Sequence, residues 1–147
     1  MSVKRIFIDN LPDSYFVVLK NIESLMFGKK MTYTARNGQI QVVDRDINWT
    51  THRSRAHLYS AGFEHRGNSI GKSYLLENID FLDGDTVIDC GANMGDLQLW
   101  FGNRNLKVNY LGIEPNPLDF SCLSKNVTTM QKPKEDKVEV NLVMNWD

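Results

Sequence analysis

Apolar residues recur at helical spacing near the start of the chain. The stripe consists of Tyr15, Val18, Leu19, Ile22, Leu25 and Met26. This spacing predicts an amphipathic helix that packs through its apolar face. Asn10 and Pro12 are typical of a helix N-terminus. Asn can cap the helix there, and the missing N–H of Pro costs no helical hydrogen bond. Gly28 predicts the end of the helix.

Two short segments, 31–36 and 39–44, flank the dipeptide Asn37-Gly38. Asn-Gly favours the positive φ angles of a two-residue turn, so the pattern predicts a β-hairpin. Residues 45–51 are polar and predict an irregular segment, whereas residues 54–61 predict a short helix that ends at a glycine.

Residues 66–73, with the sequence RGNSIGKS, resemble the phosphate loop GxxxxGK[ST]. However, only three residues separate Gly67 from Gly71, and no apolar strand precedes them. A shorter loop cannot wrap a phosphate with successive N–H groups. The segment therefore predicts a loop that leads into a helix over residues 72–79.

The second half of the chain alternates apolar runs with helical patterns. Strands are predicted at 86–90, 108–113 and 138–144, and helices at 97–101 and 117–129. The first strand is almost continuously apolar, which predicts burial on both faces. This alternation predicts an α/β fold: a Rossmann-like doubly wound parallel sheet that is incomplete, with strand order 3-2-1, preceded by the N-terminal helix and hairpin.

The composition changes this picture little. The chain has 147 residues, of which 41% are hydrophobic and 24% charged, as in an ordinary globular protein. We divide it into residues 1–80, holding the helix, hairpin and cap region, and residues 81–147, holding the sheet. A net charge of -1 gives no reason to expect nucleic acid or a membrane surface as a partner.

The two cysteines, Cys90 and Cys122, are not spaced as a metal site and are predicted to be buried thiols in a reducing compartment. No signal-peptide core or membrane-spanning run is apparent, which predicts a cytoplasmic protein.

The candidate chemistry lies at the carboxyl ends of the first two predicted strands, where open α/β sheets bind ligands. Asp89 ends the first strand, and Gly91 and Gly95 follow it, so the backbone can turn tightly and approach a ligand. Glu114 ends the second strand and can accept hydrogen bonds from both hydroxyls of a ribose. This combination predicts an adenosine-bearing cofactor.

The spacing disfavours a dinucleotide. The dinucleotide motif GxGxxG places glycine at the third and sixth positions, but here, counting from Gly91, those positions hold Asn93 and Asp96. A carboxylate in the first turn of the helix would repel a phosphate. Asp89 and Asp96 together favour a cofactor without phosphates.

Residues 86–96, TVIDCGANMGD, and 111–117, LGIEPNP, jointly resemble S-adenosylmethionine-dependent class I methyltransferases, and within them the FkbM-like family. The resemblance implies that the following residues hold the cofactor: Asp89, Gly91, Ala92, Asn93 and Gly95 around the methionine and ribose, Glu114 on the ribose hydroxyls, and Pro115 and Asn116 against the adenine. It also implies that Asn145, Trp146 or Asp147 edges the adenine ring.

The same resemblance implies methyl transfer, directed to an oxygen of a small molecule or glycan. A hydroxyl acceptor requires a general base, and the sequence does not identify one. An unperturbed imidazole titrates near neutrality, which makes His52, His57 and His65 candidates, but surface or packing roles are favoured for all three. No metal site is predicted, and the oligomeric state stays open.

Two alternatives remain. A binding or scaffolding module would keep the fold without catalysis, and an NAD-dependent oxidoreductase is disfavoured by Asn93 and Asp96. Members of the resembled family continue with a fourth strand and further strands that this sequence lacks. We therefore expect the N-terminal, cofactor-binding part of a longer protein, inactive alone, whose first strand has an unpaired edge.

Overall fold

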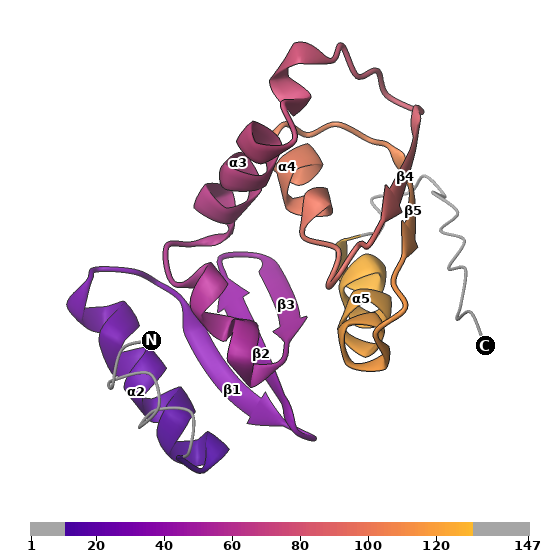
Figure 1. The fold of residues 1–147 in the computed structure, drawn as a ribbon. Helices are drawn as coiled ribbons and strands as arrows, with labels where there is room; N and C mark the ends of the chain where they lie inside the picture. The colour runs from indigo at the N-terminus through magenta and orange to yellow at the C-terminus, as the bar shows by residue number, and fades with distance from the viewer. Residues whose placement is uncertain (1–10, 131–147) are drawn as a thin grey trace. The chain divides into compact units, whose positions relative to one another are not determined.

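The computed structural model describes residues 11–130 and shows an α/β protein (Figure 1). The chain divides between Gly62 and Phe63 into two compact units, each described separately below. The predicted third strand, 138–144, and the predicted adenine-edge residues lie outside the described residues, so the strand order 3-2-1 stays a prediction. Residues 63–80, which the sequence placed with the first region, belong by their contacts to the second unit.

The first unit consists of a helix, a three-stranded antiparallel sheet and a 3₁₀ segment. In chain order these are α2 (Asp13–Met26), β1 (Thr32–Arg36), β2 (Gln39–Asp44), β3 (Ile47–Thr51) and η1 (Arg53–Tyr59), with sheet order β1-β2-β3. Asn37 and Gly38 have φ angles of 52° and 72°, which confirms the predicted hairpin turn.

Strand β3 corrects the prediction that residues 45–51 are irregular. Arg45 has a φ of 54° and lies in the tight turn that follows β2. Along β3, Ile47 is partly buried, Asn48 is exposed, and Trp49, Thr50 and Thr51 are all buried. The sequence shows no sustained alternation of apolar and polar residues over this strand, so it was not predicted.

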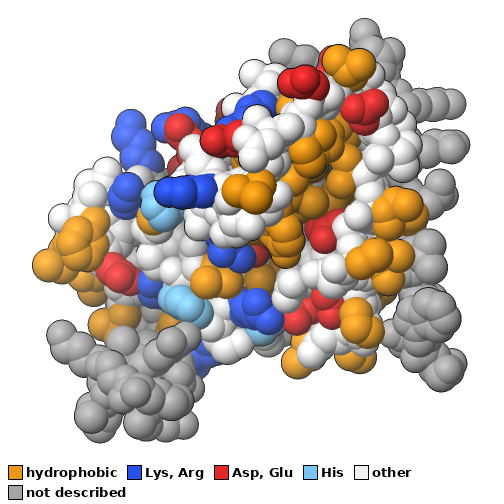
Figure 2. All heavy atoms as spheres, turned by 45° about the horizontal axis from the view of Figure 1, so that its top comes forward, with side chains coloured by type: hydrophobic (Ala, Val, Ile, Leu, Met, Phe, Trp, Pro, Cys, Tyr) orange, Lys and Arg blue, Asp and Glu red, His pale blue; other side chains and the backbone are white. Residues whose placement is uncertain are grey.

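Helix α2 begins and ends close to the predicted positions, with Gly28 at a φ of 64° after its last turn. The predicted packing face is wrong. All six residues of the apolar stripe are exposed, from 44% for Leu19 to 78% for Leu25 and Met26. The helix instead buries Phe16 and Ser24. Other exposed hydrophobic side chains are visible on the molecular face in Figure 2.

Polar contacts hold α2 to β1. Asn21 donates to the Tyr33 carbonyl at 2.9 Å and accepts the Tyr33 N–H at 2.7 Å. The Ser24 hydroxyl donates to the Met31 carbonyl at 2.9 Å. A hydrophobicity pattern does not reveal such an attachment, because the residues that make it are polar.

The second unit contains a parallel pair of strands with helices. Its elements are α3 (Phe63–Ser73), η2 (Leu76–Asn78), β4 (Thr86–Cys90), α4 (Leu97–Asn103), β5 (Asn109–Ile113) and α5 (Pro117–Met130). Strands β4 and β5 pair in parallel, with Asp89 opposite Gly112 (Figure 1). The predicted strand–helix–strand–helix order of this region is thereby confirmed.

Helix α3 corrects the prediction for residues 66–79. The glycine-bearing segment is helical, and the predicted helix over 72–79 is wrong, since only the short η2 forms there. A Cβ on Gly67 would lie 2.8 Å from the Leu99 backbone, and one on Gly71 would lie 1.9 Å from the Trp100 ring. The two glycines therefore allow α3 to approach α4 closely.

The two faces of the β4–β5 pair differ. Val87 and Tyr110 face the helices and contribute to a core with Leu123 and Val127. On the other face Ile88 is 60% exposed, so the prediction that β4 is buried on both faces is wrong.

The cysteines lie in different surroundings. Cys90 is exposed, which corrects its prediction as a buried thiol, whereas Cys122 is buried as predicted. Burial raises the pKa of the Cys122 thiol to about 11. Within residues 11–130 the helices are all too short or too polar to span a bilayer.

Candidate functional site

The candidate site is the loop that joins β4 to α4, residues 91–96. It begins at Gly91, with a φ of 82°, and the N–H groups of Gly91 and Ala92 both donate to the Ile113 carbonyl, at 2.8 and 3.0 Å. Asn93 and Gly95 also have positive φ angles, of 51° and 84°. The first turn of the loop is thus attached to the carboxyl end of β5.

Glu114 connects this loop with the one that follows β5. Its Oε2 accepts the Asn93 N–H at 2.8 Å, and its Oε1 accepts the Asn116 N–H at 2.7 Å. The residue is only 6% exposed. Each carboxylate oxygen accepts two hydrogen bonds, so these bonds leave acceptor capacity for a ligand hydroxyl.

Pro115 and Asn116, predicted to lie against adenine, are exposed. The Asn116 side chain caps α5, because its Oδ1 accepts the N–H groups of Leu118 at 2.9 Å and Asp119 at 3.3 Å. Asn116 therefore has a structural role of its own, and its predicted contact with adenine stays a prediction.

Asp89 ends β4 beside the loop. Its Oδ2 accepts the Tyr110 hydroxyl hydrogen at 2.5 Å. Burial raises the pKa of Asp89, and the negative charges of Asp96 and Glu114 raise it further, while the hydrogen bond from Tyr110 acts in the opposite direction. Asp89 is therefore a carboxylate whose charge a nearby cation would stabilise.

Asp96, at the end of the loop, is 5% exposed and forms an ion pair with Arg66 of α3. Arg66 Nε lies 3.1 Å from Asp96 Oδ2, and a second guanidinium N–H donates to the same oxygen. This pair compensates the charge of Asp96. Repulsion of a phosphate by Asp96 is consequently weaker than the sequence predicted.

The glycines of the loop differ in their surroundings. A Cβ on Gly91 would have no heavy atom within 4 Å, so the backbone at Gly91 is open to a ligand. A Cβ on Gly95 would lie 2.5 Å from the Gln98 side chain and 2.9 Å from Leu123. Gly95 is thus required by packing, whereas Gly91 borders open space.

Tyr110 and Asn126 belong to this site and were not identified from the sequence, and the contact of Arg66 with Asp96 was not predicted either. Asn126 is fully buried and donates to the Met94 carbonyl at 2.9 Å. Only Tyr110 had a signal, because a parallel register puts its side chain on the same sheet face as Asp89.

The three histidines are divided between the two units. His65 is exposed on α3. In the first unit, His52 Nδ1 lies 2.7 Å from the Ser54 hydroxyl, and His57 is exposed. The general base therefore stays unassigned, and among residues 11–130 no cluster of His, Cys, Asp and Glu could hold a metal ion.

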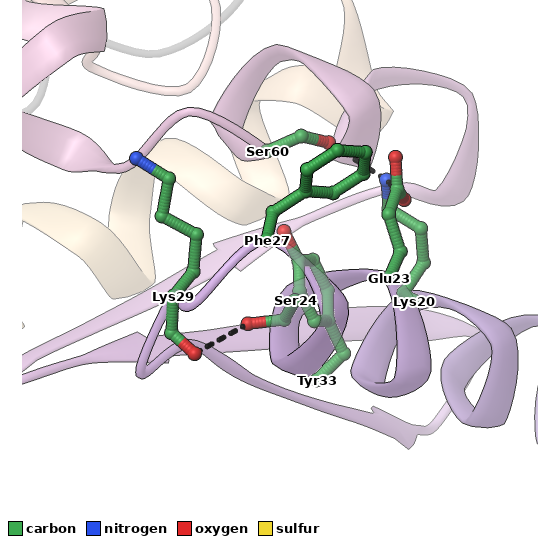
Figure 3. A pocket seen from close by; sticks show the side chains of 7 residues that line it. All are labelled: Lys20, Glu23, Ser24, Phe27, Lys29, Tyr33 and Ser60. Atoms are coloured by element: carbon green, nitrogen blue, oxygen red, sulfur yellow. Dashed lines mark hydrogen bonds and ion pairs between the residues drawn. The ribbon is translucent and has the colours of Figure 1, made fainter.

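The first unit contains a small hollow (Figure 3). It is lined by Lys20, Glu23, Ser24, Phe27, Lys29, Tyr33 and Ser60, and its cavity volume is about 10 Å³. That volume suits at most one water molecule. Lys20 also donates to the Ser60 hydroxyl at 2.7 Å across it, so the hollow is not a ligand site.

Comparisons with known proteins give one match to a solved structure. No protein-family model matches the chain, and no curated protein matches it. Among solved structures, the crystal structure of P. horikoshii TYW2 in complex with MeSAdo matches with a TM-score of 0.40 and 15% sequence identity. The match covers 78% of this chain and 43% of that one, so this chain spans less than half of the TYW2 structure.

Proposed function

We propose that the loop at residues 91–96 binds S-adenosylmethionine, and that the chain provides the cofactor-binding part of a class I methyltransferase. The observation that carries this proposal is the position of Glu114. Its buried carboxylate lies at the carboxyl end of β5 and holds Asn93 of the neighbouring loop. A ribose at the end of a parallel sheet is bound by a carboxylate in such a position.

The charges favour a cationic cofactor over a dinucleotide. Asp89, Asp96 and Glu114 interact electrostatically, and of these Asp96 is paired with Arg66. Asp89 and Glu114 therefore leave negative charge beside the loop, which favours a cofactor that carries ammonium and sulfonium groups, such as S-adenosylmethionine. An NAD pyrophosphate would meet the same two negative charges, which disfavours the oxidoreductase alternative.

In this proposal the residues of the chain bind and orient the cofactor. Glu114 accepts hydrogen bonds from the ribose, and Asp89, held by Tyr110, faces the cationic part. Open space at Gly91 allows the ligand to approach the backbone. When bound, the cofactor supplies an electrophilic methyl group, and alignment with an acceptor then provides most of the catalysis.

The identity of the acceptor rests on the FkbM-like resemblance, which suggests a hydroxyl of a small molecule or glycan. A non-catalytic cofactor-binding or scaffolding module is the second candidate. It would share the proposed cofactor contacts and differ only in lacking methyl transfer. Methyl transfer measured with the cofactor bound separates the two.

Isothermal titration calorimetry with S-adenosylmethionine, S-adenosylhomocysteine and NAD tests the proposal. We expect the first two to bind and NAD not to bind. Glu114→Gln should weaken binding at least about tenfold, because a hydrogen bond to a charged group contributes roughly 1.5–3 kcal/mol. Asp80→Asn is the matched control, since Asp80 is an exposed carboxylate of the same unit.

Glu114 also holds two backbone N–H groups, so its variant is tested for folding as well. A Gln side chain keeps only one acceptor oxygen, and some loss of stability is expected. Circular dichroism and thermal unfolding must show that Glu114→Gln remains folded at the titration temperature. Wild-type affinity in a folded variant, or tighter binding of NAD than of S-adenosylmethionine, would contradict the proposal.

A further inference from the structure

The loop at residues 91–96 is attached to the rest of its unit at several points. Ile113 and Glu114 accept N–H groups from its first half, and Asn126 of α5 holds the Met94 carbonyl. All of these contacts come from β5, from α5 or from the segment between them. They fix Gly91 to Met94, and none of them reaches Asp96.

Asp96 is bound by Arg66 of α3, a helix that precedes the loop in the sequence, whereas β5 and α5 follow it. The guanidinium reaches Asp96 because Gly67 and Gly71 bring α3 against Leu99 and Trp100 of α4. The Asp96 side chain is 6% exposed and that of Arg66 is 21% exposed, so the ion pair is shielded from solvent. A shielded pair of this kind fixes geometry more strongly than a surface pair does.

Arg66 also changes the charge that a ligand would meet. The negative charge of Asp96 is among the causes that raise the pKa of Asp89. Arg66 compensates Asp96 and thereby limits the repulsion among the three carboxylates. One side chain of α3 therefore affects both the position of the loop end and the electrostatics at the end of β4.

We propose that Arg66 is a positioning residue for the 91–96 loop. By binding Asp96 it fixes the last residue of the loop before α4, and it keeps the loop in the conformation in which Asn93 bonds to Glu114. The effect of Arg66 on ligand affinity rests on the proposed cofactor function, but its effect on loop order does not.

The chain offers a matched control at the other end of α4. Arg104 donates to Asn68 of α3 at 3.2 Å and to Glu77 of η2 at 3.1 Å, and its guanidinium lies over the Trp100 ring. It therefore also links α4 to the preceding elements, but it is exposed, and these three contacts all lie outside the 91–96 loop.

Hydrogen–deuterium exchange of the full chain without ligand provides the first test. In Arg66→Met we expect the amides of Ala92, Asn93 and Gly95 to exchange at least about tenfold faster than in the wild type, while amides of β1 to β3 are unchanged. Arg104→Met should leave the loop amides unchanged. Unchanged loop exchange in Arg66→Met, or equal acceleration in both variants, would overturn the proposal.

Ligand affinity provides the second test. S-adenosylhomocysteine should bind Arg66→Met about tenfold more weakly than the wild type, and Arg66→Lys should recover part of the loss, because Lys keeps the charge without the planar donor pair. Equal affinity of Arg66→Met and the wild type would overturn the positioning role. If the wild type does not bind, the proposed function fails, and the exchange result alone decides whether Arg66 orders the loop.

Discussion

The carboxyl group of Asp89 titrates differently in the folded protein because of its surroundings. Burial and the neighbouring charges of Asp96 and Glu114 raise its pKa in the folded protein. A group of this kind contributes stability that is present below its unfolded pKa and is lost as the pH rises through its folded pKa. At neutral pH, the charged Asp89 carboxylate therefore destabilises the folded state, and it provides a negative charge at the candidate site.

Asp89→Asn should accordingly stabilise the protein at neutral pH and weaken cofactor binding. Asn keeps an oxygen that can accept the Tyr110 hydroxyl hydrogen, so the hydrogen bond is retained while the charge is removed. The gain in unfolding free energy should shrink as the pH falls below the raised pKa. Urea unfolding at a series of pH values checks this, and a gain that does not depend on pH would contradict it.

For single residues, the sequence predicted the carboxylates at the ends of strands but not the side chains that contact them or their loop. Asp89 and Glu114 were identified because apolar runs define where β4 and β5 end. The contacts of Arg66 and Asn126 with the loop were not predicted, because their distances to the loop depend on how α3 and α5 pack on α4 and β5. Such distances between residues far apart in sequence are not encoded in local spacing.

Helix α3 shows how packing can overrule local preference. Its sequence, FEHRGNSIGKS, contains two glycines, each of which costs a helix roughly 0.5–1 kcal/mol relative to alanine. The segment is helical because the same glycines allow contact with Leu99 and Trp100, which no larger residue would permit. The predictions for α5 and the hairpin succeeded because the Asn116 cap and the Asn37-Gly38 turn agree with their packing.

Gly71→Ala should destabilise the second unit by about 1–3 kcal/mol or more, although alanine is the better helix former. The added Cβ would overlap the buried Trp100 ring, which is 2% exposed and cannot move without disturbing the core. Ser69→Ala, at an exposed position of the same helix, is the control and should be close to neutral. Chemical denaturation measures both, and stabilisation by Gly71→Ala would show that α3 does not pack on Trp100.

The whole molecule consists of two compact units, each with a buried tryptophan. Trp49 is fully buried in the first unit, and Trp100 is 2% exposed in the second. The candidate site lies wholly within the second unit. A ligand of this site should therefore stabilise the unit that contains Trp100.

We expect S-adenosylhomocysteine at about 100 times its Kd to add about 2.7 kcal/mol to the unfolding transition that Trp100 reports. The free energy of the unfolding transition that Trp49 reports should increase less. Double variants that retain only Trp100 or only Trp49, with Phe at the other two positions, allow each transition to be followed by fluorescence. Equal shifts in both variants would contradict the expectation, because the two units would then unfold together.

At the scale of the chain, the sequence predicted the α/β class and the parallel pairing of β4 with β5. The complete strand order depends on residues 138–144, outside the described part of the chain, and stays a prediction. The FkbM-like assignment also stays a prediction, since no family model matches. The exposure of the α2 stripe and of Ile88 could not be predicted, because periodicity shows which face is apolar and not what covers it.

The contrast between the two thiols makes this protein convenient for spectroscopy. Cys90 is exposed and immediately precedes Gly91, whereas Cys122 is buried and its pKa is raised to about 11. Because the thiolate is the reactive form, a maleimide dye should attach to Cys90 and spare Cys122 in the folded protein. The wild-type chain thus carries a unique labelling position, among its described cysteines, beside the candidate cofactor loop, where a fluorophore can report occupancy in real time without any engineered substitution.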